Sequence, residues 1–298
     1  MGNDINEKHR NLIIIPDGLL SFLPFEALMK EEINHSNFNK MPFWLKDHTI
    51  SYNASLDFYQ QNKTEISLEN IYGVFPIYKN TDRYLKSSEK EAEMIRDKFN
   101  AKIDQNENAT KTNFLDHANQ FDVLHLSAHA SGGSFSVPAY IEFIDDVLLL
   151  PELYAQSLET SLVVLSACET GVGKIIKGAT PMSLARGFHF AGAKNILMTQ
   201  WKVNDFATFN LMNHFYEDLQ RNKSPAISIR KAKISYLDDK SINNLEKSPY
   251  YWAGFTYYGK PINGNQTDAN FKFLYIAILC VIILLFGFYA SRSVQKKQ

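Results

Sequence analysis

The stretch that most constrains the fold of this chain lies at residues 161–171, SLVVLSACETG. Residues 162–165 are bulky and mostly branched, which is typical of a strand buried on both faces of a parallel sheet. Two small residues follow, and Cys168 stands where the strand is expected to end. Open α/β sheets bind their ligands at the carboxyl edge of the strands. The sequence therefore predicts a thiol at the ligand-binding edge of a parallel sheet.

A second apolar stretch, residues 121–128, predicts another buried strand, and His129 follows it. The roughly 38 residues between His129 and Cys168 are enough for a crossover between two parallel strands. If the two strands are neighbours, the imidazole and the thiol lie at the same edge of the sheet. The alternative is that both side chains are core residues, since cysteine often behaves as a small buried hydrophobic residue. The residues alone leave both interpretations open.

Placed at one edge, His129 and Cys168 would carry out acyl chemistry. An imidazole can deprotonate a nearby thiol, the thiolate attacks a carbonyl carbon, and the imidazolium returns the proton to the leaving amine. The backbone N–H groups of Ala130 and Cys168 are candidate donors to the oxyanion. This chemistry indicates peptide hydrolysis above all.

Strand and helix patterns alternate along the rest of the chain. Strands are predicted at 11–16, 49–52, 70–75, 195–200 and 249–258, and helices at 55–61, 87–99, 182–192, 206–219 and 226–237. Ser88 and Glu91 form a capping-box pattern at the start of one of these helices, and Asp205 stands at the N-cap of another. The alternation predicts an α/β fold with a mostly parallel sheet and helices on both faces.

The charge and the cysteine content exclude several classes of protein. The 298 residues carry a formal net charge of −1 without a stripe of lysine and arginine, which argues against nucleic acid as a partner. Two cysteines, Cys168 and Cys280, do not make a disulfide framework, and no Cys/His spacing fits a zinc site. The phosphate-loop pattern fails at Cys168 and Ile175, and no Gly-x-Gly-x-x-Gly motif is present. We therefore expect neither a metal nor an organic cofactor.

Residues 273–290 form an uncharged run near the C-terminus. At about 1.5 Å per residue the run is long enough to cross most of the hydrocarbon core of a bilayer. A buried core helix is the alternative, but the run is apolar all round and follows a polar segment. The sequence thus predicts a single-pass membrane protein and leaves open the side on which its main domain lies. The predicted organisation is a domain at 1–260, a polar linker at 261–271, a transmembrane helix at 272–291 and a basic tail at 292–298.

Six blocks of the sequence, in order, resemble the CHAT domain, a family of caspase- and separase-like cysteine peptidases usually found after tetratricopeptide repeats. The blocks are residues 12–18 (LIIIPDG) with 23–28 (LPFEAL), 125–129 (HLSAH), 164–171 (VLSACETG), 183–188 (SLARGF) with 191–193 (AGA), 201–205 (WKVND) and 251–255 (YWAGF). The resemblance implies a caspase-like α/β fold in which His129 and Cys168 are the catalytic dyad. It also implies a protein or peptide substrate and a tetratricopeptide-repeat region or partner. Since the chain opens abruptly on a strand pattern, we expect such a part upstream.

The resemblance gives Asp205 a second interpretation. It matches an acidic position in the related separase motif that helps to bind a basic side chain. The other interpretation, which the sequence favours, is the plain helix N-cap.

Three departures from the family pattern bear on activity. Ala130 replaces the glycine that usually follows the family histidine, and residues 178–180 (GAT) replace a Gly-Glu-Gly segment. Ser166 stands two residues before the cysteine, where caspases and their relatives often carry Gln or Asp, and it brings no charge. The main prediction is a membrane-anchored CHAT-type cysteine endopeptidase that cleaves proteins through a His–Cys dyad. The alternative is a catalytically weak or inactive interaction or signalling module on the same fold.

Overall fold

A computed structural model of the chain describes residues 10–53, 55–61, 67–133, 136–166, 182–222 and 224–261. All of them belong to one compact unit, Met1–Ile262. The second unit, Asn263–Gln298, contains none of the described residues. The domain boundaries drawn from the sequence, including the linker and the tail, therefore stay predictions.

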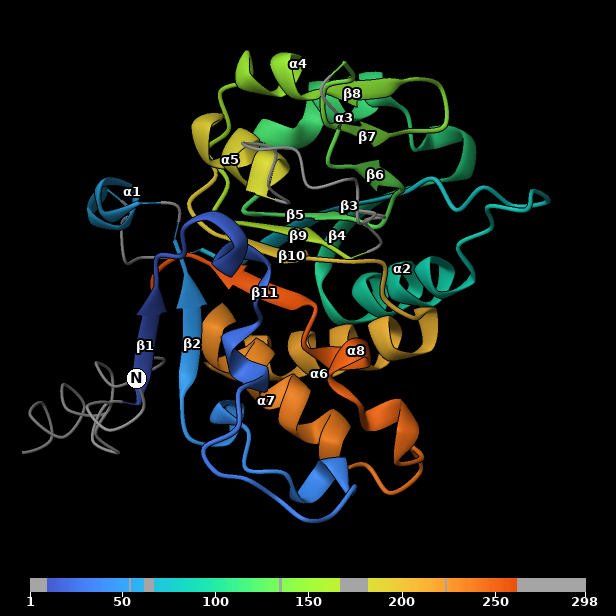
Figure 1. Cartoon of the computed structure of the whole chain (residues 1–298). Coiled ribbons are helices and arrows are strands. Elements are labelled where there is room, and N and C mark those ends of the chain that lie inside the picture. The colour runs from blue at the N-terminus through green and yellow to red at the C-terminus, as the bar shows by residue number, and fades with distance from the viewer. Residues whose placement is uncertain are drawn as a thin grey trace, which may run out of the picture. The chain divides into compact units, whose positions relative to one another are not determined.

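An eight-stranded sheet forms the centre of the first unit, with the order β1-β2-β11-β10-β9-β5-β3-β4 (Figure 1). Its strands are β1 (Asn11–Ile14), β2 (Thr49–Tyr52), β3 (Asn70–Phe75), β4 (Asn100–Gln105), β5 (Val123–Leu126), β9 (Leu162–Leu165), β10 (Ile196–Thr199) and β11 (Phe255–Tyr258). The pair β10–β11 is antiparallel, and the other pairs in this sheet are parallel. The predicted α/β fold with a mostly parallel sheet is confirmed.

A smaller antiparallel sheet of three strands follows β5 in the chain. It consists of β6 (Ala130–Ser131), β7 (Tyr140–Glu142) and β8 (Val147–Leu149). In Figure 1 it lies above the large sheet, close to the end of β5. Because β6 starts at the residue after His129, this small sheet helps to fix where the histidine stands.

Helices cover both faces of the large sheet, as predicted (Figure 1). One face carries α2 (Lys86–Lys98), α6 (Asp205–Asn222), α7 (Pro225–Asp238) and α8 (Pro249–Trp252), and the other carries α3 (Lys111–His117), α4 (Leu150–Tyr154) and α5 (Met182–Phe190). A short helix, α1 (Leu56–Gln61), follows β2. Along each strand, successive side chains point to opposite faces of the sheet. Val164 therefore packs in the hydrophobic cluster with α2, α6 and α7, and Leu165 packs in the cluster with α3, α4 and α5.

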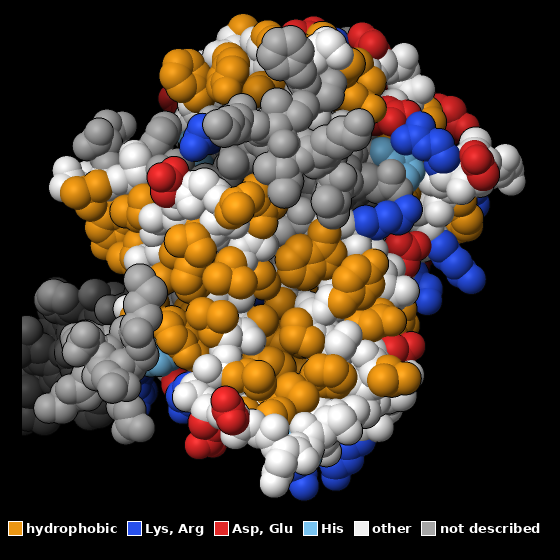
Figure 2. Space-filling model, in the orientation of Figure 1, with side chains coloured by type: hydrophobic (Ala, Val, Ile, Leu, Met, Phe, Trp, Pro, Cys, Tyr) orange, Lys and Arg blue, Asp and Glu red, His pale blue; other side chains and the backbone are white. Residues whose placement is uncertain are grey.

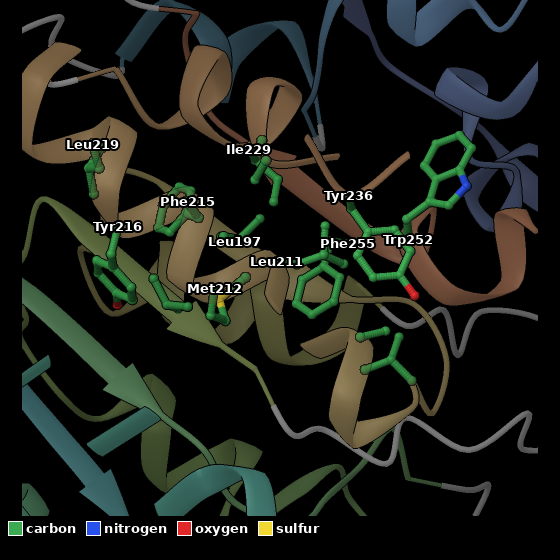
Figure 3. Packing of buried hydrophobic residues seen from close by; sticks show 14 of the residues in the cluster. Leu197, Leu211, Met212, Phe215, Tyr216, Leu219, Ile229, Tyr236, Trp252 and Phe255 are labelled. Carbon is green, nitrogen blue, oxygen red and sulfur yellow. The ribbon is translucent and has the colours of Figure 1, made fainter. Parts of the chain in front are cut away.

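The first layer is held by apolar residues at helical spacing on α6. Leu211, Phe215 and Leu219 recur every four residues, and all are at most 2% exposed. Figure 3 shows these side chains in the cluster that also contains Leu197 of β10 and Phe255 of β11. The removal of such apolar side chains from water is the main favourable contribution to the stability of the fold.

A buried ion pair attaches the N-terminal segment to this layer. Lys233 Nζ of α7 lies 3.0 Å from Glu26 Oε1, and the two side chains are 1% and 5% exposed. The Tyr52 hydroxyl donates a hydrogen bond to Glu26 Oε2, and Lys233 also donates to the Phe255 carbonyl. The pair links the segment 23–28, one of the six sequence blocks, to α7 and to two strands.

The prediction of a membrane location is corrected by the structure. Among the described residues, no helix combines the length and the apolar composition that crossing a bilayer requires. The longest of them, α6, has 18 residues and carries charged residues at both ends, including Asp205 and Arg221. The transmembrane helix predicted at 272–291 lies outside the described residues.

One face of the molecule has hydrophobic side chains gathered in its middle, with acidic and basic side chains toward the edges (Figure 2). Several large apolar side chains of the described residues are exposed, among them Leu19 (68%) and Leu20 (53%) in the segment after β1.

Candidate active site

The two strands that lead to the predicted dyad are direct neighbours. β5 and β9 pair in parallel, with Val123 opposite Leu162 and Leu126 opposite Leu165. His129 and Cys168 therefore each follow a paired position by three residues. Cys168 itself lies outside the described residues. The structure thus supports the premise of the dyad, strand adjacency, while the dyad remains a prediction.

His129 is held by the loop between β3 and α2. The imidazole is 6% exposed, its Nε2 lies 3.0 Å from the Arg83 carbonyl oxygen, and its ring lies 4.9 Å from the Tyr78 ring. Because a carbonyl oxygen can only accept, Nε2 carries the hydrogen in this contact. In a neutral imidazole the other nitrogen, Nδ1, is then the basic one. The loop therefore selects the tautomer in which Nδ1 can take a proton.

The backbone of this loop is strained where it approaches His129. Ile77 and Tyr78 have φ angles of 61° and 55°, although neither is glycine. For a β-branched residue such a φ is a genuine outlier that the surroundings must enforce. The Leu85 N–H donates to the Ile77 carbonyl at 2.9 Å, which closes the loop. Strain of this kind concentrates at functional sites, where it fixes a group in place.

An ion pair fastens the same loop to the small sheet. The Arg83 guanidinium contacts both carboxylate oxygens of Glu142, at 2.5 and 2.7 Å, and lies 5.4 Å from the centre of the Tyr78 ring. The Glu142 N–H donates to the His129 carbonyl at 2.8 Å. The loop, the small sheet and His129 therefore form one connected arrangement.

The predicted oxyanion donor Ala130 has its N–H turned away from the small sheet. The bond from Glu142 N–H to the His129 carbonyl flanks the pair Ala130–Ile141, which marks it as a non-hydrogen-bonded pair of the antiparallel ladder. The β6–β7 ladder therefore does not use the Ala130 N–H. This geometry is compatible with an oxyanion donor and does not depend on the glycine usual at this position.

A buried carboxylate that the sequence reasoning missed reaches the carboxyl ends of β5 and β9. Glu91 of α2 is 1% exposed, and its Oε2 accepts a hydrogen bond from the Ser166 hydroxyl at 2.7 Å. The same oxygen lies 3.0 Å from His125 Nε2, and His125 Nδ1 lies 2.7 Å from the Tyr216 hydroxyl. Burial, and next the Glu91 charge, raise the pKa of Tyr216 well above its usual value, so this phenol keeps its proton. We assign Tyr216 as the donor to Nδ1 and the Nε2–H of His125 as a donor to Glu91.

The capping box predicted for Glu91 is wrong. α2 begins at Lys86 without a side-chain cap, and Ser88 contacts the Ser127 hydroxyl instead, at 2.7 Å. A signal for the buried role was present, because Glu91 stands beside Ala92 on the apolar stripe of an amphipathic helix that continues at Ile95. Ser166, which brings no charge itself, binds the carboxylate that Glu91 supplies.

Asp205 does not cap α6. Asn204 Oδ1 accepts from the N–H groups of Phe206 and Ala207, at 3.0 and 3.2 Å, so the N-cap is Asn204 and the predicted cap is wrong by one residue. Burial raises the pKa of Asp205, and the Glu91 charge raises it further. Asp205 is the first residue of α6, and the setting of its side chain is not that of a cap.

That setting is a pocket of about 400 Å³ in front of the strand ends. Its lining includes Arg83, Glu91, His129, Ser166, Lys202 and Asp205. Lys202 and His129 partly offset the rise in the pKa of Asp205, which is consistent with their common place around the pocket. Within the described ranges, no group of three or more His, Cys, Asp and Glu side chains is arranged to hold a metal ion. The pocket brings the predicted His129 and Asp205 together and adds Glu91 to them.

Comparisons with known proteins agree with this architecture. A family model described as the CHAT domain matches residues 3–260. Human tetratricopeptide repeat protein 28 is 20% identical over 311 residues, a match that covers 88% of this chain and 12% of that protein. The structure resembles a chain of the Saccharomyces cerevisiae separase–securin complex, with a TM-score of 0.53 and 16% identity over 81% of this chain and 15% of that chain. The chain thus spans only a small part of the length of either protein, and the structural likeness shows a shared fold.

Proposed function

Because the chain belongs to the CHAT domain family, we propose that it is a cysteine endopeptidase that cleaves protein substrates with His129 and Cys168. The observation that supports this most is the register of β5 and β9, because each of the two residues follows a paired residue of neighbouring strands by three positions in the sequence. The hydrogen bond from His129 Nε2 to the Arg83 carbonyl adds the tautomer that a general base at Nδ1 requires.

In the proposed reaction, His129 Nδ1 takes the proton of the Cys168 thiol, and the thiolate attacks the carbonyl carbon of the scissile peptide bond. The N–H groups of Ala130 and Cys168 donate to the oxyanion. The C–N bond then breaks, and the leaving amine takes the proton from Nδ1. Water attacks the thioester with His129 again as the base, which releases the acid product and restores the thiol.

Asp205 is proposed as a substrate-binding residue for a basic side chain. Its displacement from the N-cap by Asn204 supports this interpretation, since the carboxylate lines the pocket that also contains His129. We expect Asp205→Ala to weaken cleavage beside Arg or Lys more than cleavage beside neutral residues. Equal losses on both kinds of substrate would contradict this role.

Protein partners are proposed from the two relatives. One is a tetratricopeptide repeat protein, and the other is a chain of the separase–securin complex. We propose that this domain likewise works with a tetratricopeptide-repeat region or partner, which would present substrates to the pocket.

The test compares the wild-type chain with Cys168→Ala, and with Cys280→Ala as the matched control for loss of a thiol. Each is incubated alone and with a peptide library, and cleavage is read by mass spectrometry. We expect cleavage by the wild type and by Cys280→Ala, and none by Cys168→Ala. The proposal fails if Cys168→Ala cleaves the same bonds, or if no variant cleaves anything.

A further inference from the structure

We infer that Glu91 is a specificity-determining residue of this pocket, and that its Oε1 accepts a hydrogen bond from the guanidinium or ammonium group of a substrate side chain. This inference rests on the proposed function and deepens it, because it assigns a further residue of the same site to the recognition of a basic side chain. The proposal adds the buried carboxylate of Glu91 to Asp205, which lines the same pocket.

The two oxygens of Glu91 have different surroundings. Oε2 accepts from Ser166 and from His125, which fixes the carboxylate in one orientation. Oε1 is buried as well, and it has no hydrogen-bond donor among the described residues. Buried polar atoms are nearly always hydrogen-bonded, and an unsatisfied carboxylate oxygen is costly. Since Glu91 also lines the pocket, a donor that enters the pocket can complete its hydrogen bonding.

The charges around the pocket favour a cation as this donor. Among the described residues of the lining, the acidic ones are Asp82, Glu91 and Asp205, and the basic ones are Arg83 and Lys202. The Arg83 charge is balanced by its two contacts with Glu142, which does not belong to the lining. One lysine of the described lining then stands against three carboxylates, and an entering cation would reduce this excess of negative charge. Charge-assisted hydrogen bonds to a carboxylate are about twice as strong as neutral ones, and a guanidinium offers several donors at once.

The mutual influence of the two carboxylates points in the same direction. The Glu91 charge is the second cause, after burial, of the raised pKa of Asp205. A cation bound near both would relieve this repulsion. Arginine and lysine side chains meet the requirement, whereas an acidic side chain would increase the repulsion.

The decisive variant is Glu91→Gln, because the amide oxygen can replace Oε2 toward Ser166 and His125 while the amide NH₂ replaces Oε1. Cleavage is measured on a peptide series that differs at one side chain, as arginine, lysine, citrulline or norleucine. Glu89→Gln is the matched control, since Glu89 lies on the same helix, pairs with Lys79 and does not line the pocket. Melting temperature checks the folding of both variants.

We expect the wild type to prefer arginine and lysine, and Glu91→Gln to lose about 10- to 100-fold in kcat/KM on these two peptides. The citrulline and norleucine peptides should change by less than about threefold, and Glu89→Gln should match the wild type on all four. An equal loss on all four peptides, or a wild type without preference for the basic ones, would overturn the role of Glu91.

A binding measurement separates this inference from the proposed reaction. Agmatine, which carries a guanidinium group, is titrated by calorimetry into the Cys168→Ala chain with and without Glu91→Gln. Binding that Glu91→Gln abolishes supports the cation site even if no peptide is cleaved, in which case the peptidase proposal alone fails. Cleavage of peptides by the wild type with no agmatine binding, or binding that Glu91→Gln leaves unchanged, overturns the cation site alone.

Discussion

The Arg83 carbonyl oxygen lies 3.0 Å from His129 Nε2, and this contact ties the proposed general base to a loop that is strained at Ile77 and Tyr78. A backbone carbonyl has no proton to exchange, so it holds one tautomer of the imidazole over the whole range in which the ring is neutral. The loop is in turn fastened by the ion pair between Arg83 and Glu142. The position of the His129 imidazole therefore depends on a loop that lies far from it in the sequence.

Arg83→Ala should lower kcat by about tenfold or more without unfolding the chain, because the loop loses its contacts with Glu142 and the Tyr78 ring and positions His129 less well. Steady-state kinetics on the norleucine peptide, which does not use the cation site, measure the effect. Lys79→Ala removes an exposed ion pair of the same loop and is the matched control. A kcat that is equal in all three proteins would show that the ion pair does not position His129.

Asp205→Asn should raise the melting temperature at pH 7. The folded pKa of Asp205 lies above its ordinary value of 3.8, so ionisation costs more in the folded chain than in the unfolded one. Stability is therefore lost as pH rises through the folded pKa, and the asparagine removes this loss. The gain should shrink as pH falls toward 3.8. A variant that is less stable than the wild type at pH 7 would contradict this pKa direction.

Lys233→Met should destabilise the fold by about 3–5 kcal/mol, because it leaves the buried Glu26 carboxylate without its cation. The double change Glu26→Gln with Lys233→Met should cost less than the single one, since the orphaned charge is gone. Urea unfolding followed by circular dichroism gives both values. Additive losses in the double variant would mean that the two side chains do not interact.

Phe215→Ala should cost about 3–5 kcal/mol, because Phe215 is fully buried in the cluster of α6 against β10 and β11 (Figure 3). Phe215→Leu, which keeps most of the volume, should cost less than half as much. Urea unfolding measures both. Equal losses in the two variants would indicate that the site does not depend on packed volume.

The main elements of the fold could be predicted from hydrophobic patterning. The strand at 162–165 is a continuous apolar run, the strand at 123–126 is apolar except for His125, and the helix at 205–222 has clear helical spacing, so both kinds of element follow from local sequence. The neighbouring position of β5 and β9 is a long-range fact that patterning does not contain. It came only from the structure, and the predicted dyad depends on it.

The errors arose where one sequence pattern fits two local structures, or where two neighbouring residues fit the same role. Asn204 and Asp205 are both good N-cap residues, and only the observed hydrogen bonds decide between them. The segment 249–258 was predicted as one strand because it is aromatic, but Pro249 starts a short helix and the strand begins at Phe255. Glu91 fits a capping box in sequence and a buried network in space. Sequence rules for helix ends cannot decide between a capping role for Glu91 and a hydrogen bond with a residue as distant in sequence as Ser166.

The central claim, that His129 acts on Cys168, is tested most directly by the pH dependence of alkylation at Cys168. The rate of iodoacetamide labelling is measured by mass spectrometry on the peptide containing Cys168, with N-acetylcysteine in the same tube as the reference thiol. We predict that the wild type reacts with an apparent pKa well below the ordinary value of about 8.5, and that His129→Ala returns it to about 8.5. Identical pH profiles for the wild type and His129→Ala would contradict the account.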